Sequence, residues 1–207
     1  MSIVKLNNQG VKNATAFGSI TGLGSMVFIK KLTASSSGTL SFVDGASGVV
    51  LDNTYKEYLF TFNNIHPSSD SDAHFQFQGN VAGGSGYNET ITSTYFRAYH
   101  NESGSSSSLA YDGNFDLAQS TNFQTLMTYV NYQNDECGAG TLRLFNPSST
   151  TFVKNFIAET QYNYNNPYSA NSFVGGYFNT TSAIDEIQFK FANGNIDSGD
   201  ICLYGIA

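Results

Sequence analysis

The sequence predicts an all-β fold, an antiparallel β-sandwich, and three observations point to it. The aromatic residues are abundant and suit a pleated sheet, with 17 Phe and 13 Tyr against only 3 Met. Charged residues make up 12% of the chain, which is too few for surface helices held by ion pairs. Short apolar or alternating stretches recur along the chain, and clusters of Ser, Gly, Asn and Pro that form turns separate them.

The predicted strands follow one another from Met26 to the C-terminal end. They are expected at residues 26–32, 39–43, 55–65, 74–78, 90–100, 123–132, 141–145, 152–160, 172–179, 184–192 and 201–206. The alternation is clearest where Ile187, Phe189 and Phe191 fall on one face of a strand and polar residues fall on the other. Only residues 112–124 leave room for a short helix, and the unequal spacing of the strands disfavours a solenoid or a propeller.

The last predicted strand closes the domain. Ile201 and Leu203 share the face that we expect to meet the core, while Cys202 and Tyr204 share the other. The only other cysteine is Cys137, so the chain has too few for a disulfide framework or a zinc site. We expect two free thiols.

Residues 1–25 differ from the rest of the chain, because they are small, Gly-rich and without a sustained period. Such a segment cannot bury enough surface to fold by itself. Its apolar residues are nevertheless too many for an idle linker: Ile3, Val4, Leu6, Val11, Phe17, Ile20 and Leu23. We interpret residues 1–25 as an attachment arm that orders against a neighbouring subunit, and residues 26–207 as one sandwich domain. The alternative is a first strand and surface loop of the same domain.

The charge of the chain excludes two classes of partner. The net charge is −7 and the pI is near 4.7, so the protein is negatively charged at neutral pH. This charge repels the phosphates of nucleic acids and anionic lipid surfaces. No apolar run approaches the ~20 residues that span a bilayer, and the N-terminus lacks the features of a signal peptide. We therefore expect no nucleic acid and no membrane as partner, and synthesis in a cytoplasm.

The sequence offers no catalytic constellation. Each of the three histidines stands near a predicted turn, and none belongs to a nucleophile motif. The acidic pairs Asp135–Glu136 and Asp185–Glu186 are neighbours in the chain, and neighbouring strand residues point to opposite faces. We therefore predict that the protein is not an enzyme and uses no cofactor.

Two stretches are candidate calcium sites, because calcium prefers several oxygen ligands from a loop. Asp70 and Asp72 alternate in one stretch, and Asp197 and Asp200 belong to a Gly-bearing loop in the other. Neither stretch matches a complete calcium-binding loop. A solvated turn, in which Asp and Asn adopt left-handed geometry, is the favoured interpretation of both stretches, and the sequence does not decide whether either binds calcium.

Tyrosines gather at Gln161–Tyr168, where Tyr162, Tyr164 and Tyr168 surround a predicted loop that contains proline. Rings and amides near a loop tip can bind sugars. Tyrosine is also enriched at protein interfaces. The three tyrosines are therefore predicted to contact either a glycan or a neighbouring subunit.

The C-terminal segment carries a resemblance. Residues 184–206 contain an aromatic strand, a Gly-Asn-Ile-x-x-Gly turn and a last strand that ends in Leu-Tyr-Gly-Ile. This ending, about a ninth of the chain, resembles that of jelly-roll virion structural proteins of tailed bacteriophages, particularly from marine hosts. Residues 8–19 are similar to the N-terminus of such proteins.

The resemblance implies a jelly-roll-like sandwich and a role in the phage particle. Head decoration or cement, a fibre and a tail-tip component are all compatible with it. It implies other virion proteins as partners, a homo-oligomer with a trimer favoured, and location in the virion after synthesis in the host cytoplasm. The alternative is a carbohydrate-binding module that recognises a host-surface glycan.

Overall fold

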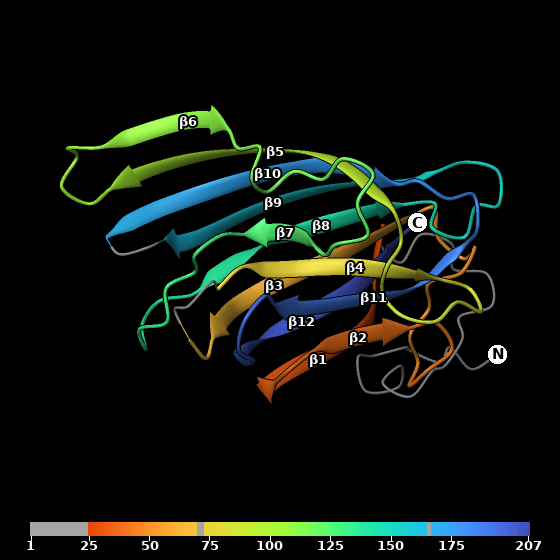
Figure 1. The fold of residues 1–207 in the computed structure, drawn as a ribbon. Coiled ribbons are helices and arrows are strands. Elements are labelled where there is room, and N and C mark those ends of the chain that lie inside the picture. The colour runs from red at the N-terminus through yellow and green to blue at the C-terminus, as the bar shows by residue number, and fades with distance from the viewer. Residues whose placement is uncertain (1–24, 70–72, 165–166) are drawn as a thin grey trace, which may run out of the picture.

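The structure is a computed structural model that describes residues 25–69, 73–164 and 167–207 (Figure 1). The described residues form twelve strands and no helix. In order, the strands are β1 (Met26–Ser37), β2 (Leu40–Val43), β3 (Glu57–Pro67), β4 (Phe75–Val81), β5 (Ile91–Asn101), β6 (Ser107–Tyr111), β7 (Gln124–Met127), β8 (Gly138–Phe145), β9 (Lys154–Tyr164), β10 (Tyr168–Phe178), β11 (Ile184–Phe191) and β12 (Ile196–Ile206).

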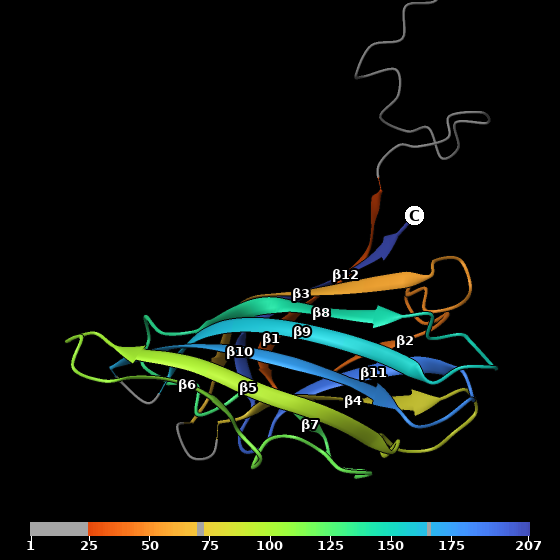
Figure 2. The same cartoon turned by 90° about the horizontal axis from the view of Figure 1, so that it is seen from above.

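The strands form two antiparallel sheets that face each other (Figures 1 and 2). The larger sheet has the order β1-β12-β3-β8-β9-β10-β5-β6, and the smaller has the order β2-β11-β4-β7. The chain changes sheet at every connection except β5–β6, β8–β9 and β9–β10, and the two runs β1-β12-β3-β8 and β2-β11-β4-β7 have the strand order of a jelly roll. In the larger sheet, β9, β10, β5 and β6 extend the four jelly-roll strands beyond β8. The predicted jelly-roll-like sandwich is confirmed.

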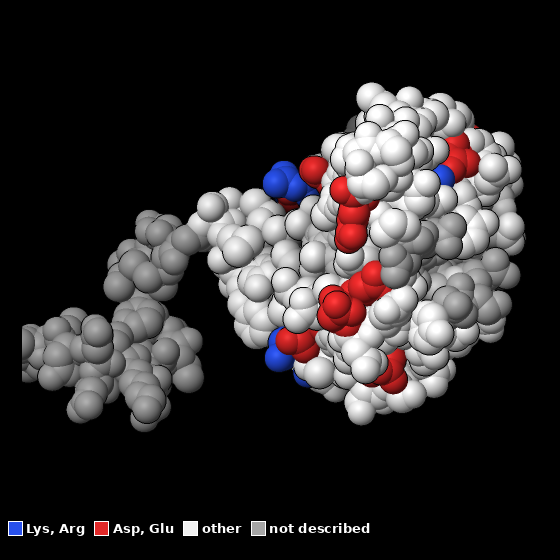
Figure 3. Space-filling view, turned by 90° about the vertical axis from the view of Figure 1, so that its left-hand side faces the viewer, with Lys and Arg blue, Asp and Glu red and all other residues white. Residues whose placement is uncertain are grey.

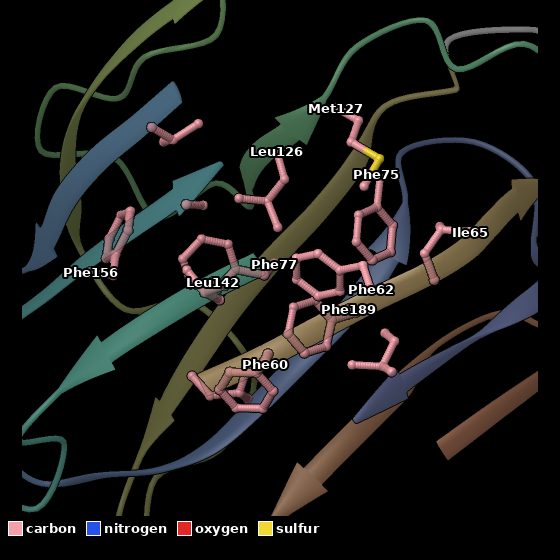
Figure 4. Packing of buried hydrophobic residues seen from close by; sticks show 14 of the residues in the cluster. Phe60, Phe62, Ile65, Phe75, Phe77, Leu126, Met127, Leu142, Phe156 and Phe189 are labelled. Atoms are coloured by element: carbon pink, nitrogen blue, oxygen red, sulfur yellow. The ribbon is translucent and has the colours of Figure 1, made fainter. Parts of the chain in front are cut away.

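Phenylalanine rings from both sheets fill the space between the layers (Figure 4). Ile187, Phe189 and Phe191 of β11 point into this core, each at most 2% exposed, as the alternation predicts. The ring of Phe189 lies with its centroid 5.3–6.3 Å from five others, those of Phe42, Phe60, Phe62, Phe75 and Phe77. The last strand also behaves as expected, with Ile201 and Leu203 fully buried.

Residues 112–120 run along the edge of β5 from Tyr95 back to Ile91, beyond the part of β5 that pairs with β6. The backbone groups of Ile91 and Ser120 bond to each other in both directions, with N···O distances of 2.8 and 3.0 Å. The backbone N–H of Ser93 donates to the carbonyl of Leu117 at 2.9 Å. The short helix for which the sequence leaves room at residues 112–124 does not form, because backbone groups of this segment bond to β5.

Several strand boundaries also differ from the prediction, and those near the candidate sites matter most. The segment 101–108, which lies between two predicted strands, includes the start of β6, and the tyrosine-rich segment belongs to β9 up to Tyr164 and to β10 from Tyr168. β12 begins at Ile196, because Gly199 adopts φ 122° and lets the strand bulge past β3. A β-carbon there would lie 2.6 Å from the carbonyl oxygen of Asn64.

One further prediction is confirmed, and two others concern residues that the structure does not describe. Cys137 and Cys202 are free thiols, as expected. Residues 1–24, and with them almost the whole predicted arm, lie outside the described residues. Asp70 and Asp72 lie outside them too.

Candidate binding surfaces

The three predicted tyrosines do not form one exposed set. Tyr162 points into the core and is 2% exposed. Its hydroxyl lies 2.9 Å from the hydroxyl oxygens of both Thr128 and Ser172, and Tyr95 reaches Ser172 at 2.6 Å. Tyr162 therefore lacks the free ring face that a glycan or a subunit would contact, and the predicted contact reduces to Tyr164 and Tyr168.

Tyr164 and Tyr168 stay partly exposed at the ends of β9 and β10. Together with Tyr99 of β5 they form a cluster in which the ring centroids lie 5.7–6.0 Å apart. The Arg97 guanidinium lies 4.5 Å from the ring centre of Tyr164 and 5.5 Å from that of Tyr99. We call these four residues the tyrosine–arginine cluster.

The cluster is held in place from below. Arg97 is only 10% exposed in its side chain, donates to the hydroxyl of Thr128 and forms an ion pair with Asp112 at 3.2 Å. Burial raises the pKa of Tyr164 above its ordinary value, and the Arg97 charge partly offsets that rise. The tyrosine edges that face solvent are therefore rigid, which lowers the entropy cost of any contact they make.

A second feature is a cleft on the outer face of the smaller sheet, with a volume of about 450 Å³. Its floor is a cross-strand row: Lys190 of β11 lies opposite Gln76 of β4, and Gln76 lies opposite Thr125 of β7. The Gln76 side chain donates to the Thr125 hydroxyl at 3.1 Å. The remaining lining residues are His74, Tyr87, Asn114, Phe115, Asp116, Leu117, Thr121, Asn122 and Phe123, and we call this site the amide cleft.

Two buried glutamines fix the wall of the amide cleft. The side-chain amide nitrogen of Gln78 lies 3.0–3.3 Å from the carbonyl oxygens of Glu89, Thr121 and Asn122. The side-chain amide of Gln124 donates to the carbonyl of Phe115 at 2.9 Å. Both side chains are fully buried, so residues 112–123 are held against the smaller sheet by bonds that water does not weaken.

Figure 3 shows an end of the molecule where Asp and Glu side chains cross the face and Lys and Arg lie toward its margins. The segment before β8 and the first residues of β12 form an acidic pocket. Asp135, Glu136 and Asp197 line it together with His66, around about 490 Å³. The Nε2 atom of His66 lies 3.1 and 3.2 Å from two backbone carbonyls, and its Nδ1 atom lies 3.8 Å from Asp197.

Asp200, the other half of the predicted calcium pair, points elsewhere. Its carboxylate accepts a hydrogen bond from Thr33 at 2.5 Å and pairs with Lys31 at 3.1 Å, and these two bonds lower its pKa. Asp197 and Asp200 thus have different partners. No group of three metal-binding side chains occurs among the described residues.

The two outermost strands of the larger sheet, β1 and β6, differ in how well they are protected against pairing with a strand from another molecule. β1 carries Lys30 and Lys31, and such charges discourage strand addition. β6 has no charged residue, and in the described part of the chain it pairs with β5 alone. Apolar side chains surround this free edge: Leu109 is 72% exposed, Tyr111 58% and Phe96 41%.

The comparisons with known proteins identify no relative: no family model, no curated protein and no solved structure matches the chain. None of the described residues belongs to a helix that is long and apolar enough to cross a membrane.

The sequence singled out neither the amide cleft nor the β6 edge. The floor and the wall of the cleft come from segments far apart in the chain, and only the folded topology brings Gln76 and Lys190 beside Asn122. The one sequence feature that points to the cleft is the cluster of polar residues at 112–124, where four amide side chains occur together with two aromatic rings.

Proposed function

We propose that this chain is a structural protein of a tailed-bacteriophage particle, which acts through self-assembly and by presenting its surface. The C-terminal resemblance supports this, and its segment forms β11, the following turn and β12. The jelly-roll connectivity is compatible with the same role. Its partners are further copies of itself and other virion proteins.

The observation that carries the proposal is the free edge of β6. Monomeric proteins shield an outer strand with charges, proline or a covering segment, because exposed N–H and C=O groups invite another strand. Leu109 stands on this uncharged strand with 72% of its surface exposed. Beside it, the ring of Phe96 stacks on Phe173 at 5.0 Å on the outer face of the sheet. A neighbouring subunit that adds a strand to β6 would bury these side chains and form hydrogen bonds with the exposed backbone N–H and C=O groups of β6.

Two added charges on β6 are expected to break the assembly. The double variant Ser107→Lys, Leu109→Lys leaves the core untouched, since both side chains are solvent-exposed. The full chain is expected to elute as an oligomer in size-exclusion chromatography with light scattering, and the variant as a monomer. The control Asn53→Lys, Phe152→Lys makes the same change of charge at exposed sites away from the edge.

The control is expected to keep the oligomer. A parent chain that is monomeric at every concentration, or a β6 variant that assembles as the parent does, would contradict the proposal.

Carbohydrate recognition is the second candidate function, and the tyrosine–arginine cluster favours it. Its tyrosines are rigid and partly exposed, and an aromatic ring offers an apolar face to a sugar. The double variant Tyr164→Ala, Tyr168→Ala is expected to weaken glycan binding about tenfold or more if the cluster is the contact. Glycan-array binding of parent and variant measures this.

The matched control is Tyr132→Ala, which removes an exposed ring that lies outside the cluster. Tyr162 is unsuitable for this test, because its loss would open a cavity in the core. Equal binding by parent, double variant and control would remove the cluster from consideration.

A further inference from the structure

We propose that the amide cleft is a binding site for a neutral saccharide. The proposal takes its ligand class from the second candidate function, but it concerns a different face of the molecule from the tyrosine–arginine cluster. The cleft is large enough for a small ligand, at about 450 Å³.

The lining supplies the hydrogen-bonding groups that hydroxyl-rich ligands need. An amide presents a donor and an acceptor side by side, which matches two neighbouring hydroxyls of a sugar ring. The Asn122 side chain makes no hydrogen bond within the described residues, and Gln76 uses only one of its amide hydrogens, toward Thr125. Asn114 spends one amide hydrogen on Asp112 and is otherwise exposed. Three amides therefore keep unused capacity around one space.

The lining also includes apolar side chains. Phe115, Leu117 and Phe123 line the cleft. The Lys190 ammonium lies 4.4 Å from the ring centre of Phe123, so that one ring face is already covered by a charge. A largely apolar ligand would leave the surrounding amides unpaired, whereas a sugar would use both kinds of surface.

The charges of the cleft favour a neutral ligand. Asp116 and Lys190 are the carboxylate and the ammonium that line it, and they balance. The Asp116 carboxylate accepts a hydrogen bond from Tyr111, and among the described residues no carboxylate forms an ion pair with Lys190. The Asp116 carboxylate would repel an anionic sugar, and the Lys190 ammonium would repel a cationic one.

The cleft is preorganised. The floor row stands on three paired strands, and the wall is tied to the buried Gln78 and Gln124. Ser93 adds a further tie, because its hydroxyl accepts from the backbone N–H of Leu117 at 2.9 Å and donates to Gln124. Little conformational freedom remains to be lost on binding, so even a few hydrogen bonds to a sugar can yield measurable affinity.

The test starts from an array of immobilised neutral and acidic oligosaccharides, probed with the full chain. The glycan with the strongest response is then titrated by calorimetry against the parent and the variants. Asn122→Ala and Gln76→Ala are each expected to weaken binding about tenfold or more, because each removes a paired donor and acceptor. The matched control Asn155→Ala removes an exposed amide on the other sheet and is expected to bind as the parent does.

Two further variants separate the outcomes. Lys190→Met removes the ammonium that lines the cleft, and its effect on a neutral glycan is expected to be smaller than that of Asn122→Ala, since a neutral ligand gains little from one partly exposed charge. If Tyr164→Ala, Tyr168→Ala abolishes binding while Asn122→Ala does not, the tyrosine–arginine cluster is the site and the amide cleft is not. If only acidic glycans bind, and Lys190→Met abolishes that binding, the proposed neutral class of ligand is wrong. If no glycan binds, the cleft proposal and the carbohydrate function both fail, while the oligomer measured in chromatography still decides the structural role.

Discussion

Phe189→Ala is expected to lower the free energy of unfolding by about 3–5 kcal/mol. The ring is fully buried at the centre of the core and lies beside five other phenylalanine rings from both sheets (Figure 4). Its removal leaves a cavity that rigid strands cannot close, so the cost of the cavity adds to the lost burial. Urea-induced unfolding followed by circular dichroism measures the change.

Two variants accompany this measurement. Phe189→Leu keeps much of the volume and is expected to cost less than the alanine variant, so it stays folded if Phe189→Ala does not. Phe152→Ala removes a ring that is 69% exposed and is expected to stay within about 0.5 kcal/mol of the parent. A loss below about 1 kcal/mol for Phe189→Ala would contradict the central place of this ring in the core.

The sequence is sufficient to predict the sandwich because the information lies in single strands. In β11 the alternation of Phe with polar residues states which side chains are buried, and the structure places those rings in the core. The same rule predicts Ile201 and Leu203 of β12. Each of these inferences needs only a local pattern and the period of a strand.

Where tertiary contacts determine the conformation or the burial of a segment, the local sequence pattern does not predict it. Residues 112–123 have no period of their own, and their conformation follows from bonds to β5 and to two buried glutamines. Tyr162 and Tyr164 are separated by one residue and so share a face of β9, yet Tyr162 is buried in the core and Tyr164 reaches solvent at the end of the strand. Sequence clustering therefore grouped tyrosines that differ in exposure.

The candidate sites show the same limit. The amide cleft needs three strands in register and a wall from a fourth segment, none of which is visible in a linear pattern. The β6 edge becomes apparent only when the order of strands is known, since the five-residue strand is too short for alternation to predict. Binding surfaces on this fold are properties of the arrangement of strands.

Alkaline pH is expected to destabilise the protein through its buried tyrosines. Tyr58 of β3 is fully buried, and its hydroxyl donates to the backbone carbonyl of Asp52 at 3.0 Å. Burial, with the negative charges of Asp52 and Asp44 in addition, raises the pKa of Tyr58 to about 12. Burial also raises the pKa of Tyr95, which lies in the hydroxyl network of Ser172 and Tyr162.

The sign follows from which state loses its proton first. An unfolded tyrosine titrates near pH 10, so above that pH the unfolded chain gains ionisation that the folded chain resists. The stability that Tyr58 contributes is complete below about pH 10 and is lost as the pH rises through about 12. The loss from Tyr58 amounts to about 2–3 kcal/mol at the end of that window, and Tyr95 adds to it in the same direction.

The free energy of unfolding, measured between pH 8 and 12, tests this. Tyr58→Phe removes the titrating hydroxyl together with one hydrogen bond, so it is expected to be less stable than the parent at pH 8 and to decline less steeply above pH 10. Phe60→Leu serves as the control, because it weakens the same strand of the core but keeps the phenol. It is expected to lie below the parent by a constant amount and to decline just as steeply. If Tyr58→Phe and Phe60→Leu decline in parallel, the alkaline loss does not come from Tyr58, and the buried phenol is not what limits the stability of the fold at high pH.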